Sequence, residues 1–179
     1  MRKMTTFALF ATALVALGCG VGAADGAGSS GDGDDAAAED KPAKPAKPAK
    51  IGQAARDGKF EFTVKSTKCG VSKVGSDLLG TTAQGQFCLV TVKVKNIGKE
   101  PQTLIDSSQK AYDAEGTEYS TDSAAAIYAN EDQQTLFNEI NPGNQVTGVL
   151  VFDIPKKVKL TTLELHDSPF SGGVEVALN

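Results

Sequence analysis

Hydrophobic and polar residues alternate most regularly over residues 86–96, which read QFCLVTVKVKN. This is the period of a β-strand with one buried and one exposed face. Cys88 has an even residue number, like Val90, Val92 and Val94, and is expected to point toward the same core as these three valines. The following NIGK segment has turn residues and ends the strand. The alternation sets three valines against three polar residues: Val90, Val92 and Val94 against Thr91, Lys93 and Lys95.

Shorter segments of the same kind lie on both sides of this central strand. Residues 70–85 are expected to form a loop that partly folds over the core, and Asp122 or Ser123 is expected to cap one short helix, with a long loop as the alternative. The pattern gives about seven or eight short antiparallel strands, which predicts an all-β sandwich over residues 58–179, with a barrel as the alternative. The other strands are expected at residues 60–68, 104–105, 111–119 (a hairpin turning over 113–116), 146–154, 163–165 and 174–178.

The N-terminus has the pattern of an export signal. Arg2 and Lys3 precede an apolar run at residues 7–17 that is shorter than a membrane span. The run ends in LGC, which resembles a bacterial lipobox, so residues 1–18 are expected to be a lipoprotein signal peptide and Cys19 the lipidated N-terminus. Secretory cleavage near Ala23 is the alternative. The expected location is the extracytoplasmic face of a bacterial membrane, lipid-anchored, or else secreted.

Residues 19–57 are expected to be a disordered tether. They contain no aromatic residue and, after Val21, only Ile51 among large aliphatic side chains. Such a segment buries too little apolar surface to offset its ordering entropy. Its first half is acidic and rich in glycine, whereas residues 41–50 repeat Pro-Ala-Lys and favour a semi-rigid polyproline spacer.

The chain has three cysteines. With Cys19 lipidated or removed, Cys69 and Cys88 remain, and an even pair in an exported domain indicates a disulfide. Cys69 has the parity opposite to the buried phenylalanines of its strand, so the bond requires a β-bulge or a strand end near Lys68. Metal binding by the pair is the alternative, although zinc normally takes four ligands.

Composition and charge narrow the classes of function. The net charge is −4, whereas a nucleic-acid interface needs a basic face, so we expect no nucleic-acid partner. His166 is the one histidine and falls on the exposed face of its strand, which leaves no histidine pair for a zinc triad. We therefore expect no catalytic residue, no metal ligand and no cofactor.

Carboxylates gather between the predicted hairpin and the next apolar strand. They could bind a cation or a basic partner, although such a group is more often a solvated face. We take six of them as a possible binding surface: Asp113, Glu115, Glu118, Asp122, Glu131 and Asp132.

Four segments carry a resemblance to a known family: GKFEFTVKS, LVTVKVKNIGKEP, YDAEGTEYS and NPGNQVTGVLVFDIP. They are similar to a bacterial domain of unknown function, an immunoglobulin-like sandwich of Gram-positive and actinobacterial lipoproteins sometimes mislabelled as telomeric repeat-binding factors. More distantly, they resemble a secreted mycobacterial immunogenic protein of the same fold. The resemblance covers residues 58–179 and implies an immunoglobulin-like fold and an envelope location, with no catalytic residues to carry over.

Two functions remain open from the sequence. The first is a membrane-anchored, non-enzymatic binding module that engages an envelope protein or ligand through loops or exposed edges. The second is an envelope enzyme or metal-binding protein that uses the acidic residues. An enzyme would show a concave site with converging carboxylates, whereas a binding module would show an exposed apolar or edge surface.

Overall fold

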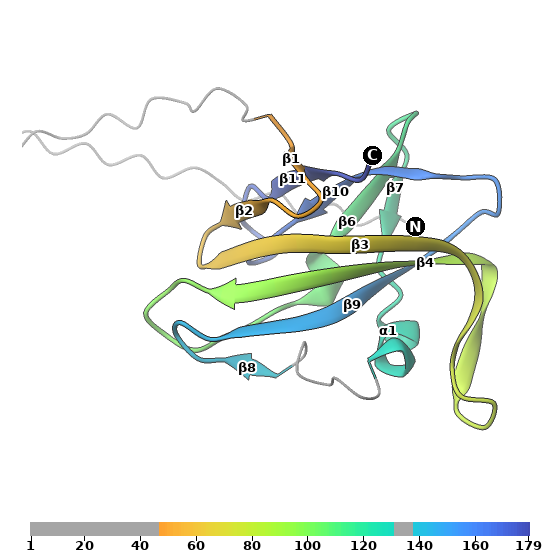
Figure 1. The fold of residues 1–179 in the computed structure, drawn as a ribbon, viewed down its shortest axis with the longest axis horizontal. Coiled ribbons are helices and arrows are strands. Elements are labelled where there is room, and N and C mark those ends of the chain that lie inside the picture. Colours follow the sequence, from red (N-terminus) through yellow and green to blue (C-terminus); the bar gives the residue numbers. More distant parts are fainter. Residues whose placement is uncertain (1–46, 131–137) are drawn as a thin grey trace, which may run out of the picture. The chain divides into compact units, whose positions relative to one another are not determined.

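The computed structural model describes residues 47–130 and 138–179, which form a β-sandwich (Figure 1). One sheet has the strand order β1-β11-β10-β6-β7, the other has the order β2-β3-β4-β9, and β5 pairs with β8. The β1–β11 pair is parallel and the other pairs are antiparallel. The strands are β1 (Ala49–Lys50), β2 (Ala54–Asp57), β3 (Phe60–Gly75), β4 (Gly80–Asn96), β5 (Gln102–Thr103), β6 (Lys110–Asp113), β7 (Glu118–Ser120), β8 (Glu139–Ile140), β9 (Gln145–Ile154), β10 (Leu160–Leu165) and β11 (Val174–Ala177).

The hydrophobic core lies between the two larger sheets. β4 contributes Cys88 and the three valines of the alternating segment, all fully buried. Opposite them, Leu163 and Leu165 of β10 and Val176 of β11 close the core from the five-stranded sheet. Neither sheet closes on itself among the described residues, so the all-β sandwich is confirmed and the barrel alternative is not.

The longest elements are β3 and β4, which continue well beyond the predicted strands. The expected loop at residues 70–85 is wrong: β3 runs on to Gly75, β4 starts at Gly80, and the two remain paired to the turn. We call residues 65–86 the hairpin arm. Its register shifts between Val64 and Ser66 and again after Lys68, and these irregularities break the alternation that identifies a strand in sequence.

The folded domain starts before Gly58, where the sequence predicted its boundary. β1 pairs with β11, and β2 pairs with β3 through contacts such as Ala55 opposite Phe62. Ala55 is buried in the core. These strands are two and four residues long and contain mainly small or charged residues, so they are held by backbone pairing and leave little hydrophobic pattern.

Several local predictions are confirmed. A helix, α1 (Ser123–Ala129), begins after Asp122, whose carboxylate accepts a hydrogen bond from the Ala125 amide at 2.9 Å. β6 and β7 form the expected hairpin, with Gly116 in its turn at φ +81°.

The predicted strand at residues 104–105 is instead β5 just before them, followed by a short 3₁₀ helix at Asp106–Ser108. In the described part of the chain, the helices are all too short or too polar to span a membrane.

Candidate functional site

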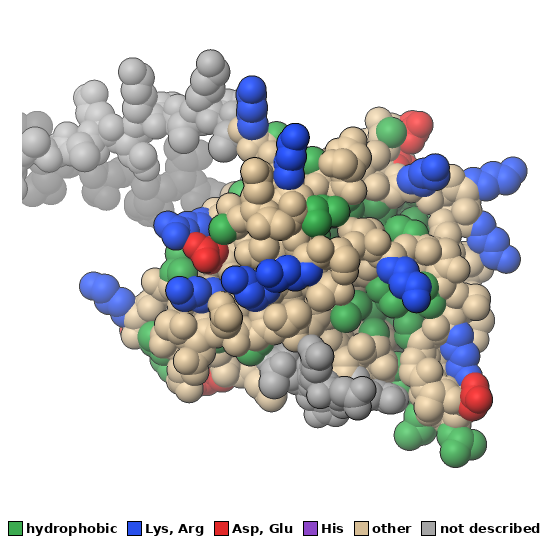
Figure 2. All heavy atoms as spheres, in the orientation of Figure 1, with side chains coloured by type: hydrophobic (Ala, Val, Ile, Leu, Met, Phe, Trp, Pro, Cys, Tyr) green, Lys and Arg blue, Asp and Glu red, His purple; other side chains and the backbone are tan. Residues whose placement is uncertain are grey.

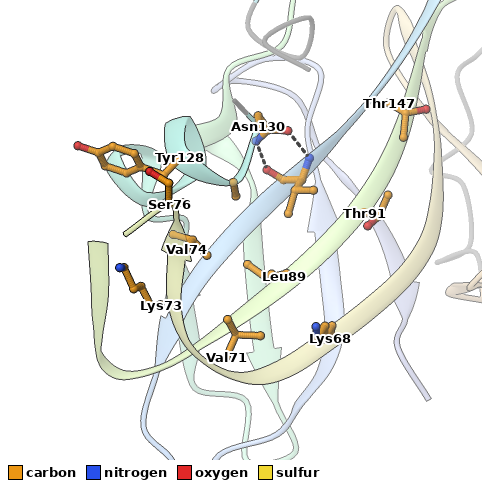
Figure 3. Close-up of a pocket in the computed structure, with 13 residues that line it drawn as sticks. Lys68, Val71, Lys73, Val74, Ser76, Leu89, Thr91, Tyr128, Asn130 and Thr147 are labelled. Atoms are coloured by element: carbon orange, nitrogen blue, oxygen red, sulfur yellow. Dashed lines mark hydrogen bonds between the residues drawn. The ribbon is translucent and has the colours of Figure 1, made fainter. Parts of the chain in front are cut away.

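A groove lies on the outer face of the four-stranded sheet and has a volume of about 740 Å³. Its floor is formed by Leu89 and Thr91 of β4 and by Thr147 and Val149 of β9. The hairpin arm, with Lys73 among its lining residues, forms one wall, and the end of α1 forms another (Figure 3). The groove therefore combines a floor of aliphatic and threonine side chains with further polar groups at its margins.

The aliphatic part of the floor exists because both faces of β4 and β9 carry hydrophobic residues. Residues of even number, such as Val90 and Leu150, enter the central core, whereas Phe87 and Val151 lie on the outer face. There they form a second, smaller cluster with Val74 and the buried Ala125 and Ala126 of α1. α1 covers part of this outer cluster, and the uncovered part continues into the groove.

A side chain completes the sheet where the groove meets α1. The Asn130 amide is buried, donates to the Val149 carbonyl at 2.9 Å, and accepts from the Val149 amide at 2.8 Å (Figure 3). At the other end of α1, the backbone amide of Asp122 donates to the Val151 carbonyl at 2.7 Å. The helix is thus fixed to the edge of β9 at both ends, which holds the groove wall in place.

Cations gather on the same face as the groove. Figure 2 shows Lys and Arg side chains over β3 and β4. Lys68 and Lys73 line the groove itself, and among its described lining residues there is no carboxylate and no imidazole. Further along the strands lie Lys93 and Lys95, beside Glu61, whose pKa is lowered first by its hydrogen bond from Arg56 and then by nearby positive charges. The groove is therefore suited to a ligand with negative charge and apolar surface.

A polar network occupies the outer face of the other sheet. The Tyr112 hydroxyl donates to Glu164 at 2.8 Å, and Lys110 pairs with Glu118 at 2.7 Å. Burial, and then the hydrogen bond to Glu164, raise the pKa of Tyr112 above its ordinary value, whereas the bond from Lys110 lowers the pKa of Glu118. The half-buried His166 also lies within 3.1 Å of Glu164. The Tyr112–Glu164 bond joins β6 to β10, and the Lys110–Glu118 pair joins β6 to β7.

Of the six acidic residues predicted as a binding surface, the four in the described ranges each have a separate local setting. Asp113 accepts from the amides of its own turn and from the Tyr119 hydroxyl, Glu118 pairs with Lys110, and Asp122 caps α1. Glu115 is exposed in the β6–β7 turn, whereas Glu131 and Asp132 lie outside the described residues. Across the described ranges, no group of three His, Cys, Asp or Glu side chains could hold a metal ion.

The predicted disulfide joins Cys69 of β3 to Cys88 of β4. The irregular register after Lys68 supplies the expected bulge, because Lys68 pairs with Leu89 and Val71 with Phe87, leaving two residues opposite Cys88. Gly70, the second of these, has φ +83°, a conformation that favours glycine. Cys88 is fully buried and Cys69 is exposed, so the bond fixes the base of the hairpin arm to the core.

The strand order and the core between the two sheets define an all-β sandwich domain. The chain belongs to the family described as "Domain of unknown function (DUF4352)", whose match covers residues 49–176. That match begins at β1 and agrees with the early start of the folded domain. It confirms the resemblance to a bacterial family of unknown function.

The similar proteins support the same fold. The chain is 31% identical over 114 residues to the uncharacterized protein YxkC of Bacillus subtilis, a match that covers 60% of this chain and 63% of YxkC. The chain thus spans less than two thirds of that relative's length. The yjhA protein of B. subtilis has a TM-score of 0.54 at 20% identity, covering 73% of this chain and 99% of that one. The secreted protein MPT63 of Mycobacterium tuberculosis has a TM-score of 0.52 at 19% identity, covering 75% and 95%.

The groove residues were not predicted from the sequence. Leu89 and Val149 lie in predicted strands, at positions that alternate with buried residues and therefore face outward. An apolar residue at an outward position is the sequence signal that could have indicated a second covered or binding surface. Asn130 follows a predicted helix, and its pairing with Val149 depends on tertiary placement. No local pattern indicates it.

Proposed function

We propose that this protein is an extracytoplasmic, membrane-anchored lipoprotein whose sandwich domain is a non-enzymatic binding module, with the groove as its binding site. The observation that carries the proposal is the groove itself: a floor of aliphatic and threonine side chains, two lysines at the margin, and walls formed by α1 and the hairpin arm. Concave, largely apolar sites with a few placed polar groups are typical of ligand binding.

The composition of the groove favours binding over catalysis. General acid–base chemistry requires a group that can exchange a proton near its operating pH, most often His, Asp or Glu. The described lining offers lysine, tyrosine, hydroxyl and amide groups with aliphatic surface. An extended ligand that has apolar surface and negative charge fits this lining. A segment of another envelope protein that contains acidic and apolar residues would be such a ligand.

The location rests on two features. The Cys69–Cys88 disulfide is typical of a protein that folds in an oxidising compartment outside the cytoplasm. The LGC sequence ending at Cys19 follows a basic and then apolar N-terminal segment, which is the order of a lipoprotein signal. The relatedness in fold to the secreted protein MPT63 agrees with export.

Fatty-acid labelling tests the anchor. The wild-type chain should carry labelled lipid and enter the detergent phase, and Cys19→Ala should lose the label. Label retained at the N-terminus of Cys19→Ala would contradict lipidation at Cys19.

A cross-linked pull-down from envelope fractions tests the binding site. Thr91→Glu places a negative charge on the groove floor, where it should repel a negatively charged ligand and abolish capture of the partner. Thr162→Glu is the matched control, since Thr162 is also half-buried on a strand but belongs to the five-stranded sheet. Equal capture by both variants would contradict the proposed site.

A further inference from the structure

The turn of the β3–β4 hairpin exposes two adjacent leucines. Leu78 is 95% exposed and Leu79 is 65% exposed. Figure 1 shows the arm extending beyond the rest of the sheet, and Figure 2 shows apolar atoms at its tip. Tight turns favour Gly, Asn, Asp and Ser, so the turn itself does not require leucine at these positions. Adjacent apolar side chains at such exposure indicate a contact surface.

The turn presents these leucines in a defined direction. The Ser76 amide donates to the Leu79 carbonyl at 2.7 Å, and the Leu79 amide donates to the Ser76 hydroxyl at 3.0 Å. Gly75 has φ +84° and lies against the Leu79 backbone, where a Cβ would clash. The turn is thus closed by its own hydrogen bonds, and the leucines cannot fold back without breaking them.

The hairpin arm carries a net positive charge, with its lysines along β3 and Asp77 beside Leu78 at the tip. The hairpin arm contains Lys65, Lys68 and Lys73, and Asp77 is its one acidic residue. Asp77 pairs with Lys73 at 3.2 Å. The arm is therefore cationic in a chain whose net charge is −4, which makes it complementary to an anionic surface.

We propose that Leu78 and Leu79 insert into the interface of an anionic lipid bilayer while the lysines of the arm contact the phosphate headgroups. A tip of two leucines is far smaller than a stable protein interface, which buries about 1,200–2,000 Å². A bilayer accepts a convex apolar tip without a complementary shape, and clustered lysines are attracted to anionic headgroups at short range. A lipid surface therefore fits these features better than a protein partner.

This inference goes beyond the groove and rests on the membrane location proposed above. It would fix the orientation of the domain at the membrane, because the arm that carries the leucines also forms a wall of the groove. The groove would then open near the headgroup layer. Insertion of the tip into vesicles is measured without reference to lipidation of Cys19 or to capture of a partner by the groove. A negative result for either of those two proposals is therefore distinguishable from a negative result for insertion.

Tryptophan fluorescence provides the test, because the chain contains no tryptophan. Leu78→Trp places one at the tip, and Phe170→Trp, at a side chain 97% exposed in the β10–β11 loop, is the matched control. Each full-length protein is combined with vesicles of phosphatidylcholine and phosphatidylglycerol that carry brominated acyl chains. We expect a blue shift and several-fold stronger quenching for Leu78→Trp than for Phe170→Trp.

Three outcomes would overturn the inference: no quenching of Leu78→Trp, equal quenching of both proteins, or a shift of Leu78→Trp emission only on adding soluble envelope protein. Adding Lys68→Gln and Lys73→Gln to Leu78→Trp should reduce the quenching severalfold on these vesicles. Unchanged quenching would overturn the role of the lysines. Because Leu78 is almost fully exposed, its substitution leaves the core intact, and unchanged thermal melting confirms this for each variant.

Discussion

The side-chain amide of Asn130 pairs with both backbone polar groups of Val149, at 2.9 and 2.8 Å. In this position the side chain replaces a neighbouring strand along the edge of β9. The same amide also donates to the Ala126 carbonyl at 2.7 Å, which ends α1. One residue therefore closes a sheet edge, ends a helix and fixes a wall of the groove. An edge covered in this way is protected from pairing with another chain.

Asn130→Ala should lower the free energy of unfolding by about 1–3 kcal/mol, because it leaves the partly buried Val149 amide and carbonyl without their partner. Chemical denaturation measures the change. Asn144→Ala is the control, since the Asn144 side chain is exposed, and it should leave stability nearly unchanged. Similar small effects for both variants would show that α1 does not depend on the Asn130 bonds.

Reduction of the Cys69–Cys88 disulfide should lower stability by about 2–4 kcal/mol, because the unfolded chain gains conformational freedom. The melting temperature should fall by on the order of 10 °C. Cys88→Ser should cost more than Cys69→Ser, since only Cys88 is fully buried and its hydroxyl would lack a partner in the core. Free, alkylated thiols in protein taken from the envelope would contradict the bond.

Ala55 tests where the folded domain begins. Ala55→Asp puts a carboxylate into the core opposite Phe62 and should destabilise the domain by about 3 kcal/mol or more. The neighbouring Ala54 is exposed, so Ala54→Asp should have little effect. Thermal melting of the two full-length variants compares them, and equal melting temperatures would mean that β2 contributes nothing to the core.

Asp113 should make stability dependent on pH. Burial alone would raise its pKa, but hydrogen bonds from Thr117 and Tyr119 outweigh burial and hold the pKa below its ordinary value. The folded protein therefore binds this proton less readily than the unfolded chain, so the stabilisation is present at neutral pH and is lost as pH falls through the folded-state pKa.

Comparison with Asp113→Asn measures this effect. The wild type should be more stable than Asp113→Asn at neutral pH. The difference should shrink as pH falls below the ordinary aspartate pKa of the unfolded chain, about 3.9, and through the lower pKa of the folded state. Urea denaturation at several pH values measures both proteins. A difference that stays constant with pH would mean that the charge of Asp113 contributes nothing to the turn.

The sequence predicts elements whose signal is local. Alternation places the three valines of β4 and Cys88 in the core, Asp122 caps the helix, and the Asp113–Gly116 turn closes a hairpin. Each of these depends on neighbours a few residues away. The sandwich follows from them because short alternating strands separated by turns must bury one face together.

Other features depend on contacts between distant residues. The bulge at Cys69 and Gly70 interrupts the alternation of β3, so the outer half of the hairpin arm looks like a glycine-rich loop in sequence. The Tyr112–Glu164 bond requires the register of β6 against β10. The Asn130–Val149 pairing likewise requires the placement of α1, and the groove exists only because of that placement.

Site-specific photo-cross-linking tests the central claim, that the groove is the binding site, most directly. A photoreactive residue replaces Thr147 on the groove floor or, as the control, the exposed Glu175 on β11. The full-length proteins are irradiated in intact envelope. We expect one discrete cross-linked species from position 147 and none from position 175, with the species from position 147 lost when Thr91→Glu is added. No cross-link from position 147, or the same products from both positions, would contradict the account.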